Sequence, residues 1–89
     1  MFRLWGKLWK DTHLVKDVVI EDDRKEINRT RKIYDALDKV CDEFDLCRPI
    51  WLESTVEEFL KRDRTRFGKD NFIEEIEFDY LEIHVIEED

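Results

Sequence analysis

The sequence contains very little glycine and proline. Two glycines, Gly6 and Gly68, and one proline, Pro49, occur in 89 residues. Loops that cradle phosphate groups need closely spaced glycines, so no nucleotide-binding loop of that kind is present. Gly/Ser-rich linkers and internal repeats are also missing, so we predict a single domain, residues 1–89. A chain of this length forms one core and has no room for a large ligand cavity.

Cysteine and histidine are almost as rare. Cys41 and Cys47 are too few for a disulfide scaffold, and their spacing relative to His13 and His84 matches no common structural zinc site. Two histidines also offer no recognisable Ser-His-Asp grouping. The sequence therefore identifies no catalytic, cofactor-binding or metal-binding residue and no small-molecule substrate, and we predict that the protein is not an enzyme.

Long apolar runs are missing as well. No uninterrupted run approaches the roughly 20 residues that cross a bilayer. No basic and apolar leader of the kind that directs secretion precedes the first strongly patterned segment. We therefore expect a cytoplasmic protein without a membrane-spanning helix.

Charge, in contrast, is abundant and unevenly distributed. Charged residues make up 45% of the chain, and the net charge is -8. Residues 1–69 contain 16 basic and 15 acidic residues, whereas the remaining nine acidic residues lie in 70–89, where no Lys or Arg occurs. This acidic balance disfavours nucleic-acid binding, with a local exception at the basic side chains of residues 61–66.

Three segments have the composition of β-strands. Residues 14–21, "LVKDVVIE", are rich in β-branched residues, and the preceding "DTH" favours a turn, so residues 2–10 and 14–21 should form a hairpin. Residues 77–87 should form a third strand. Alternation places Leu14 on the same face as Val18 and Ile20.

Two segments have helical periodicity. Asp23 and Glu26 resemble a capping box, and apolar residues at three- and four-residue spacing predict a helix from about Arg24 to Phe44. A second capping pattern at Ser54 and Glu57 predicts a short helix over 55–62, followed by a loop around Gly68. We therefore predict an α+β fold in which a small, mostly antiparallel sheet, the N-terminal hairpin plus the C-terminal strand, packs with one long and one short helix.

The predicted strands carry apolar side chains on both faces. Phe2, Leu4 and Leu8 alternate with Trp5 and Trp9, and the last strand places Tyr80 opposite Leu81. A one-sided antiparallel sheet would alternate apolar and polar residues instead. The second face should therefore be covered, either by the short helix or by another protein chain, which makes Trp5, Trp9 and Tyr80 candidate interaction residues.

The long helix carries a stripe of carboxylates in its second half, where the helix dipole favours cations. Its members are Asp35, Asp38, Asp42 and Asp45. Like charges at this spacing repel one another, so a compensating group is expected. Arg48 or the basic residues of 61–66 could supply it internally, and a basic protein partner is the alternative.

These patterns leave three functional hypotheses. The first is a protein-protein interaction module that binds a protein partner or forms a homodimer through an apolar sheet face. The second is an acidic mimic of nucleic acid that inhibits a protein with a basic groove. The third is a peripheral membrane-surface protein, because residues 2–10 plotted as a helix separate apolar from basic side chains. The expected partners of the preferred first hypothesis include no nucleic acid and no membrane.

Three stretches also carry a resemblance along most of the chain. "FRLWGKLWKD", "RPIWL" and "DNFIEEIEFDYLEIHVIEED" resemble segments of a group of short, uncharacterised proteins from anaerobic Gram-positive bacteria. The resemblance implies a bacterial cytoplasmic protein and assigns no activity, cofactor or site residue.

Overall fold

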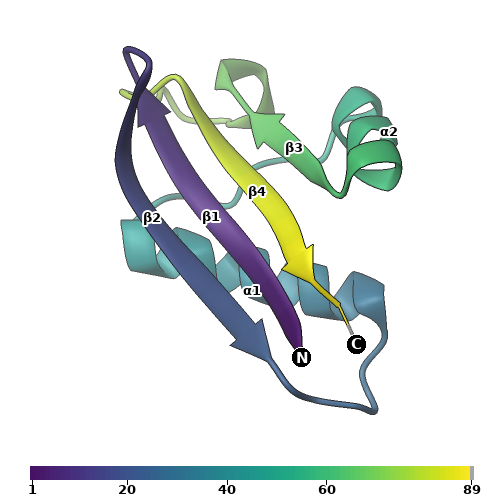
Figure 1. Ribbon diagram of the computed structural model, residues 1–89. Coiled ribbons are helices and arrows are strands. Elements are labelled where there is room, and N and C mark those ends of the chain that lie inside the picture. Colours follow the sequence, from purple (N-terminus) through teal and green to yellow (C-terminus); the bar gives the residue numbers. More distant parts are fainter. Residues whose placement is uncertain (89) are drawn as a thin grey trace.

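The sheet has four antiparallel strands in the order β2-β1-β4-β3, with helix α1 packed across one face (Figure 1). A computed structural model describes residues 1–88, which confirm the predicted α+β fold. No helix among these residues is long and apolar enough to cross a membrane. The elements are β1 (Phe2–Lys10), β2 (His13–Asp22), α1 (Arg29–Phe44), α2 (Glu53–Arg62), β3 (Arg64–Phe67), the 3-10 turn η1 (Lys69–Asn71) and β4 (Tyr80–Glu87).

The N-terminal segment forms the predicted hairpin. Asp11 and Thr12 form its two-residue turn with φ angles of 51° and 65°, the left-handed values that suit the twist of paired strands. A register shift after Leu8 places Leu14 opposite Trp9, so Leu14 joins the face of Trp9 and not that of Val18 as alternation predicted. Residues 2–10 are a strand, so their interpretation as an interfacial helix is wrong.

Helix α1 starts five residues later than the capping pattern predicted. Its N-cap is Asn28, whose side-chain oxygen accepts a hydrogen bond from the Arg31 N–H at 2.9 Å. The predicted Asp23 cap is wrong because Asp22 binds both the backbone and the guanidinium of Arg24, which holds this segment outside the helix. The helix ends at Phe44 as predicted, since Asp45 adopts a left-handed conformation.

The second half of the chain differs from the prediction at three places. Thr55, and not Ser54, closes the start of α2, because its hydroxyl accepts a hydrogen bond from the Leu52 N–H at 2.8 Å. The predicted loop after α2 contains strand β3, and the last strand begins at Tyr80 instead of near residue 77.

The core lies between α1 and one face of the sheet. Leu4 of β1 and Ile83 of β4 are fully buried against the face of α1 that carries Val40. Gly6 permits this close packing, since a Cβ at its position would lie 2.6 Å from Cγ1 of Val40. Helix α2 extends the same core through Phe59 and leaves the second sheet face bare, so the expectation that the short helix covers that face is wrong.

Candidate functional site: the open face of the sheet

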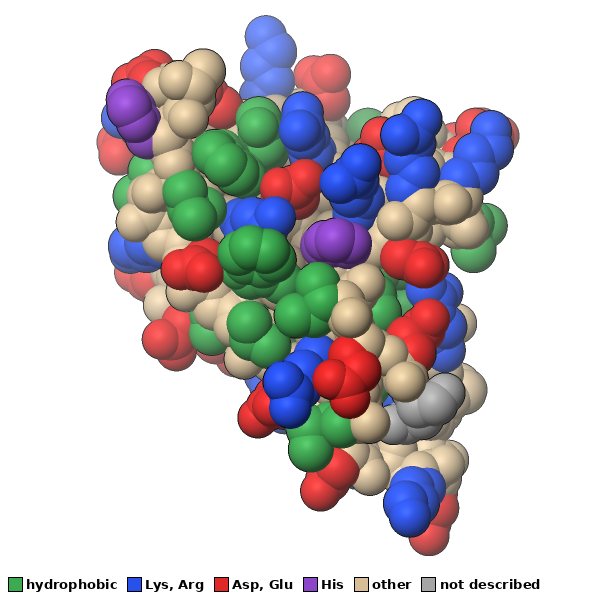
Figure 2. Space-filling model, in the orientation of Figure 1, with side chains coloured by type: hydrophobic (Ala, Val, Ile, Leu, Met, Phe, Trp, Pro, Cys, Tyr) green, Lys and Arg blue, Asp and Glu red, His purple; other side chains and the backbone are tan. Residues whose placement is uncertain are grey.

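The face of the sheet opposite α1 is covered by neither helix, and we call it the open face. Side chains of directly paired residues point to the same side of a sheet, so the strand register identifies its members. Figure 2 views this face, where hydrophobic, basic and acidic side chains and a histidine lie together. The open face consists of Arg3, Trp5, Lys7 and Trp9 of β1, Leu14, Asp17, Val19 and Glu21 of β2, Tyr80, Glu82, His84 and Glu87 of β4, and Arg64 and Arg66 of β3.

One row of charges crosses all four strands at the centre of this face. Asp17 pairs with Lys7, Lys7 with Glu82, and Glu82 with Arg66 in the strand register, so the signs alternate. Lys7 Nζ lies 3.7 Å from Glu82 Oε1, and Arg66 Nε lies 3.7 Å from Glu82 Oε2. The side chains of Lys7 and Glu82 are only 14% and 10% exposed. We call these four residues the charge row.

Aromatic rings flank the charge row and are held by it. The indole N–H of Trp5 donates to Asp17 at 3.0 Å, and that of Trp9 donates to Glu82 at 3.1 Å. Lys7 Nζ lies 3.7 Å from the centre of the Trp5 ring, which is cation-π geometry. Both tryptophans therefore keep fixed orientations although no other element covers them.

Tyr80 is positioned in the same way at the β3 side of the face. Its ring centre lies 6.2 Å from that of Trp9, and the Arg66 guanidinium lies 4.6 Å from the Tyr80 ring. The open face is thus a rigid arrangement of aromatic and charged side chains whose polar groups already have partners. A binding partner would not have to order these side chains.

The open face is electrically balanced in a protein with a net charge of -8. Asp17 and Glu21 on β2 form its acidic border, and Arg64 and Arg66 on β3 form its basic border. In the middle, Arg3 approaches Glu21 at 3.1 Å and Glu87 at 3.4 Å. The acidic members are Asp17, Glu21, Glu82 and Glu87, and the basic members are Arg3, Lys7, Arg64 and Arg66.

His84 lies between the rings and the basic border, opposite Trp5 on β1 and Arg64 on β3. Burial lowers the pKa of His84, and the nearby charges of Lys7 and Arg64 lower it further, against the opposing effect of Glu82 and Asp63. The imidazole is therefore neutral at pH 7. No nucleophile and third orienting group lie beside it on the open face, so the geometry assigns it no catalytic role.

The structure separates the predicted interaction residues into two groups. Trp5, Trp9 and Tyr80 lie together on the open face, whereas the carboxylates of α1 lie on the other side of the sheet. Asp45 ends the helix and has no part in the face.

Arginines neutralise the remaining carboxylates of the stripe. Asp35 binds Arg24 at 2.8 Å and Arg31 at 3.2 Å, and the hydrogen bond from Arg24 lowers the pKa of Asp35. Arg48 binds Asp38 at 3.2 Å and Asp42 at 2.8 Å. The compensation is internal, as one of the two predicted alternatives stated, and the acids of α1 and β4 form no common track.

Sequence reasoning missed the charged half of the open face. Alternation along β1 and β4 already places Lys7 beside the tryptophans and Glu82 and His84 beside Tyr80, and this signal was available. Arg64 and Arg66 had no such signal, because their four-residue strand was predicted to be a loop.

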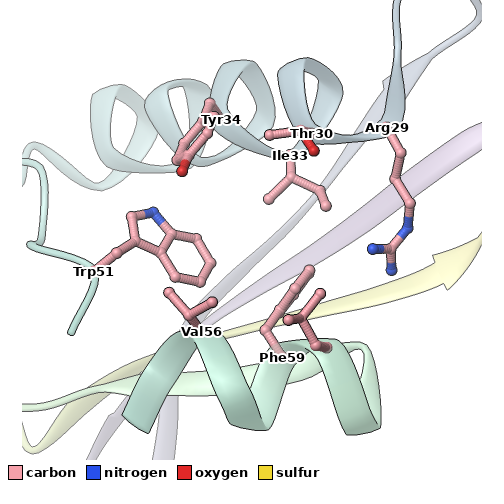
Figure 3. A pocket seen from close by; sticks show the side chains of 8 residues that line it. Arg29, Thr30, Ile33, Tyr34, Trp51, Val56 and Phe59 are labelled. Atoms are coloured by element: carbon pink, nitrogen blue, oxygen red, sulfur yellow. The ribbon is translucent and has the colours of Figure 1, made fainter. Parts of the chain in front are cut away.

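A second apolar surface lies in the groove between α1 and α2 (Figure 3). The rings of Trp51 and Phe59 meet edge to face at its base, with centres 5.6 Å apart, and half-exposed Tyr34 closes one end. Its volume of about 140 Å³ accommodates one apolar side chain or a small ring and is too small for a cofactor. The lining residues are Arg29, Thr30, Ile33, Tyr34, Trp51, Val56, Phe59 and Leu60.

The cysteines and histidines do not come together. Cys41 is buried in the core, where burial raises the pKa of its thiol to about 11, and Cys47 is exposed. His13 lies at the hairpin turn and His84 on β4. Within residues 1–88, no group of three histidines, cysteines or carboxylates is arranged to hold a metal ion.

The fold and the open face define a small antiparallel α+β protein with one covered and one uncovered sheet face. No protein family, no curated protein and no solved structure matches the chain. The resemblance to short proteins of anaerobic Gram-positive bacteria therefore stays a prediction.

Proposed function

We propose that this protein is a cytoplasmic protein-protein interaction module and that it binds its partner through the open face. One observation carries the proposal: three aromatic side chains lie on a sheet face that neither helix covers, and charged neighbours hold them in fixed orientations. Tryptophan, tyrosine and arginine dominate the energetics of protein interfaces, and all three types meet here.

The electrical balance of the open face supports a protein partner over a nucleic acid. Binding to phosphate groups requires an excess of positive charge, and the gain comes from the release of counterions. The four basic residues of the open face are matched by four acidic ones, and Glu82 at the centre would repel phosphate. A protein surface with charges of both signs fits this pattern.

Photo-crosslinking tests the proposal in the cells that produce the protein. A benzophenone amino acid at Tyr80, on the open face, should give covalent protein adducts. The same group at Ile73, which is 88% exposed and lies outside the sheet, serves as the matched control and should give none. Equal adduct yields at the two positions, or no adduct at Tyr80, would contradict the proposal.

A further inference from the structure

We infer that the partner of the open face is a second copy of this chain, stacked face to face about a twofold axis that runs parallel to the strands. The inference rests on the proposed function and adds the identity of the partner and its orientation. Such an axis reverses the strand order and keeps the height along the strands. It therefore places β1 over β4 of the partner subunit and β2 over β3 of the partner subunit.

The charge row is complementary to itself under this rotation. Read from β2 to β3, its signs are negative, positive, negative and positive. Reversal of the order places Asp17 over Arg66 of the partner subunit and Lys7 over Glu82 of the partner subunit. Every charge in the row then faces one of opposite sign, and each contact occurs twice because a twofold interface is isologous.

The rows above and below the charge row match as well. Trp9 pairs with Tyr80 within one chain, so the rotation places Trp9 over Tyr80 of the partner subunit. Trp5 in the same way faces His84 of the partner subunit. Arg3 faces Glu87 of the partner subunit, so aromatic residues meet aromatic residues and opposite charges meet throughout.

The alternative twofold axis is unfavourable. An axis across the strands, along the charge row, keeps the strand order and reverses the height. It stacks Asp17 on Asp17 of the partner subunit and Lys7 on Lys7 of the partner subunit, and like charges in contact are repulsive. The charge pattern thus selects one of the two face-to-face orientations.

Desolvation of the charge row opposes stacking less than its composition suggests. Burial of an ion pair is usually costly because both charges lose water. Lys7 and Glu82 are already 86% and 90% buried within one chain, since their exposed fractions are 14% and 10%. Most of that cost is therefore part of folding, and the apolar area of the rings is left to drive association.

Charge reversal at the two ends of the charge row tests the inference, because Asp17 and Arg66 are exposed and their substitution leaves the core intact. Sedimentation velocity at micromolar to submillimolar concentration and low salt should show a dimer of the unmodified chain. Asp17→Lys and Arg66→Glu should each raise the dimer Kd at least tenfold, because each creates two like-charge contacts. An equimolar mixture of the two variants should restore the dimer as a heterodimer, since Lys and Glu then face each other.

Two matched controls separate this effect from net charge. Glu43→Lys and Lys39→Glu change the charge by the same amounts on exposed positions of α1, on the other side of the sheet, and should leave the dimer intact. Monomeric unmodified chain, or failure of the mixture to associate, overturns the inference. Adducts to a different protein from Tyr80 together with a monomeric chain would overturn the second copy and leave the proposed function standing, whereas no adduct at all would overturn both.

Discussion

Lys7 and Glu82 are directly paired across the central strands β1 and β4, on the side of the sheet that carries no helix. Lys7 Nζ lies 3.7 Å from Glu82 Oε1, and both side chains are mostly buried although only their own neighbours cover them. Glu82 also accepts the indole N–H of Trp9 and lies beside Arg66. One carboxylate thus connects the three strands β1, β4 and β3.

Removal of that carboxylate should be the most destabilising charge change on the sheet. Glu82→Leu leaves Lys7, Arg66 and the Trp9 N–H without an acceptor, and we expect the free energy of unfolding to fall by about 2–4 kcal/mol. Lys7→Met should cost less, because Glu82 keeps Arg66. The double variant should lie near the unmodified protein, and urea unfolding of all four proteins measures the coupling. Additive effects of the two substitutions would contradict this account.

Gly6→Ala should destabilise the protein by about 1–3 kcal/mol, because the added methyl group overlaps Val40 of α1 at 2.6 Å. Gly68→Ala is the matched control, since its nearest atom would be Asp79 O at 3.8 Å and its φ of -98° suits any residue. Thermal unfolding should rank the two variants clearly. Addition of Val40→Ala to Gly6→Ala should recover part of the loss, and no recovery would argue against the overlap.

Asp22 should make the fold sensitive to acid. The hydrogen bonds from the Arg24 guanidinium lower the pKa of Asp22 to about 2, below the value of about 3.9 expected in the unfolded chain. The contribution to stability is therefore fully present above about pH 4 and is lost as the pH falls through 2. Asp22→Asn should lower stability at pH 7 by about 1–2 kcal/mol and have little effect at pH 2. Urea midpoints measured across this range check the slope.

His84 should add a second, milder pH dependence. Burial lowers its pKa in the folded protein, so the unfolded chain takes up a proton first as the pH falls below about 6.5. Stability should decline from there until the pH reaches the pKa of the folded form, and His84→Gln should remove this decline. NMR titration of the His84 ring gives the folded pKa directly. A value at or above 6.5 would be inconsistent with the burial of the imidazole.

The sequence predicts elements whose signals are local. The hairpin, the end of α1 at Phe44 and most of its buried face follow from β-branched composition and from three- and four-residue periodicity. The start of α1 could not be placed, because Asp23 carries the stronger capping pattern while Asp22 instead binds Arg24 in the folded chain. Leu14 changed faces because of a bulge, which alternation cannot predict.

Half of the open face was predictable for the same reason. Trp5, Trp9 and Tyr80 follow from alternation within single strands. The bond between Trp9 and Glu82 joins residues 73 positions apart, and it depends on the register of β1 against β4, which only the packed core determines. The arginines of β3 depend on a strand too short to recognise without its neighbour.

The reversals of the chain have a consequence for its unfolded state. Asp11, Thr12, Asp45 and Asp63 are the residues with positive φ among 1–88, and neither glycine is one of them. Glycine would adopt these angles without strain, but it would also give the unfolded chain more conformations, worth about 0.4–1 kcal/mol per position. The protein therefore accepts local strain at its hairpin turn and at both helix ends, and in return its unfolded chain is stiffer and has less backbone entropy to lose on folding.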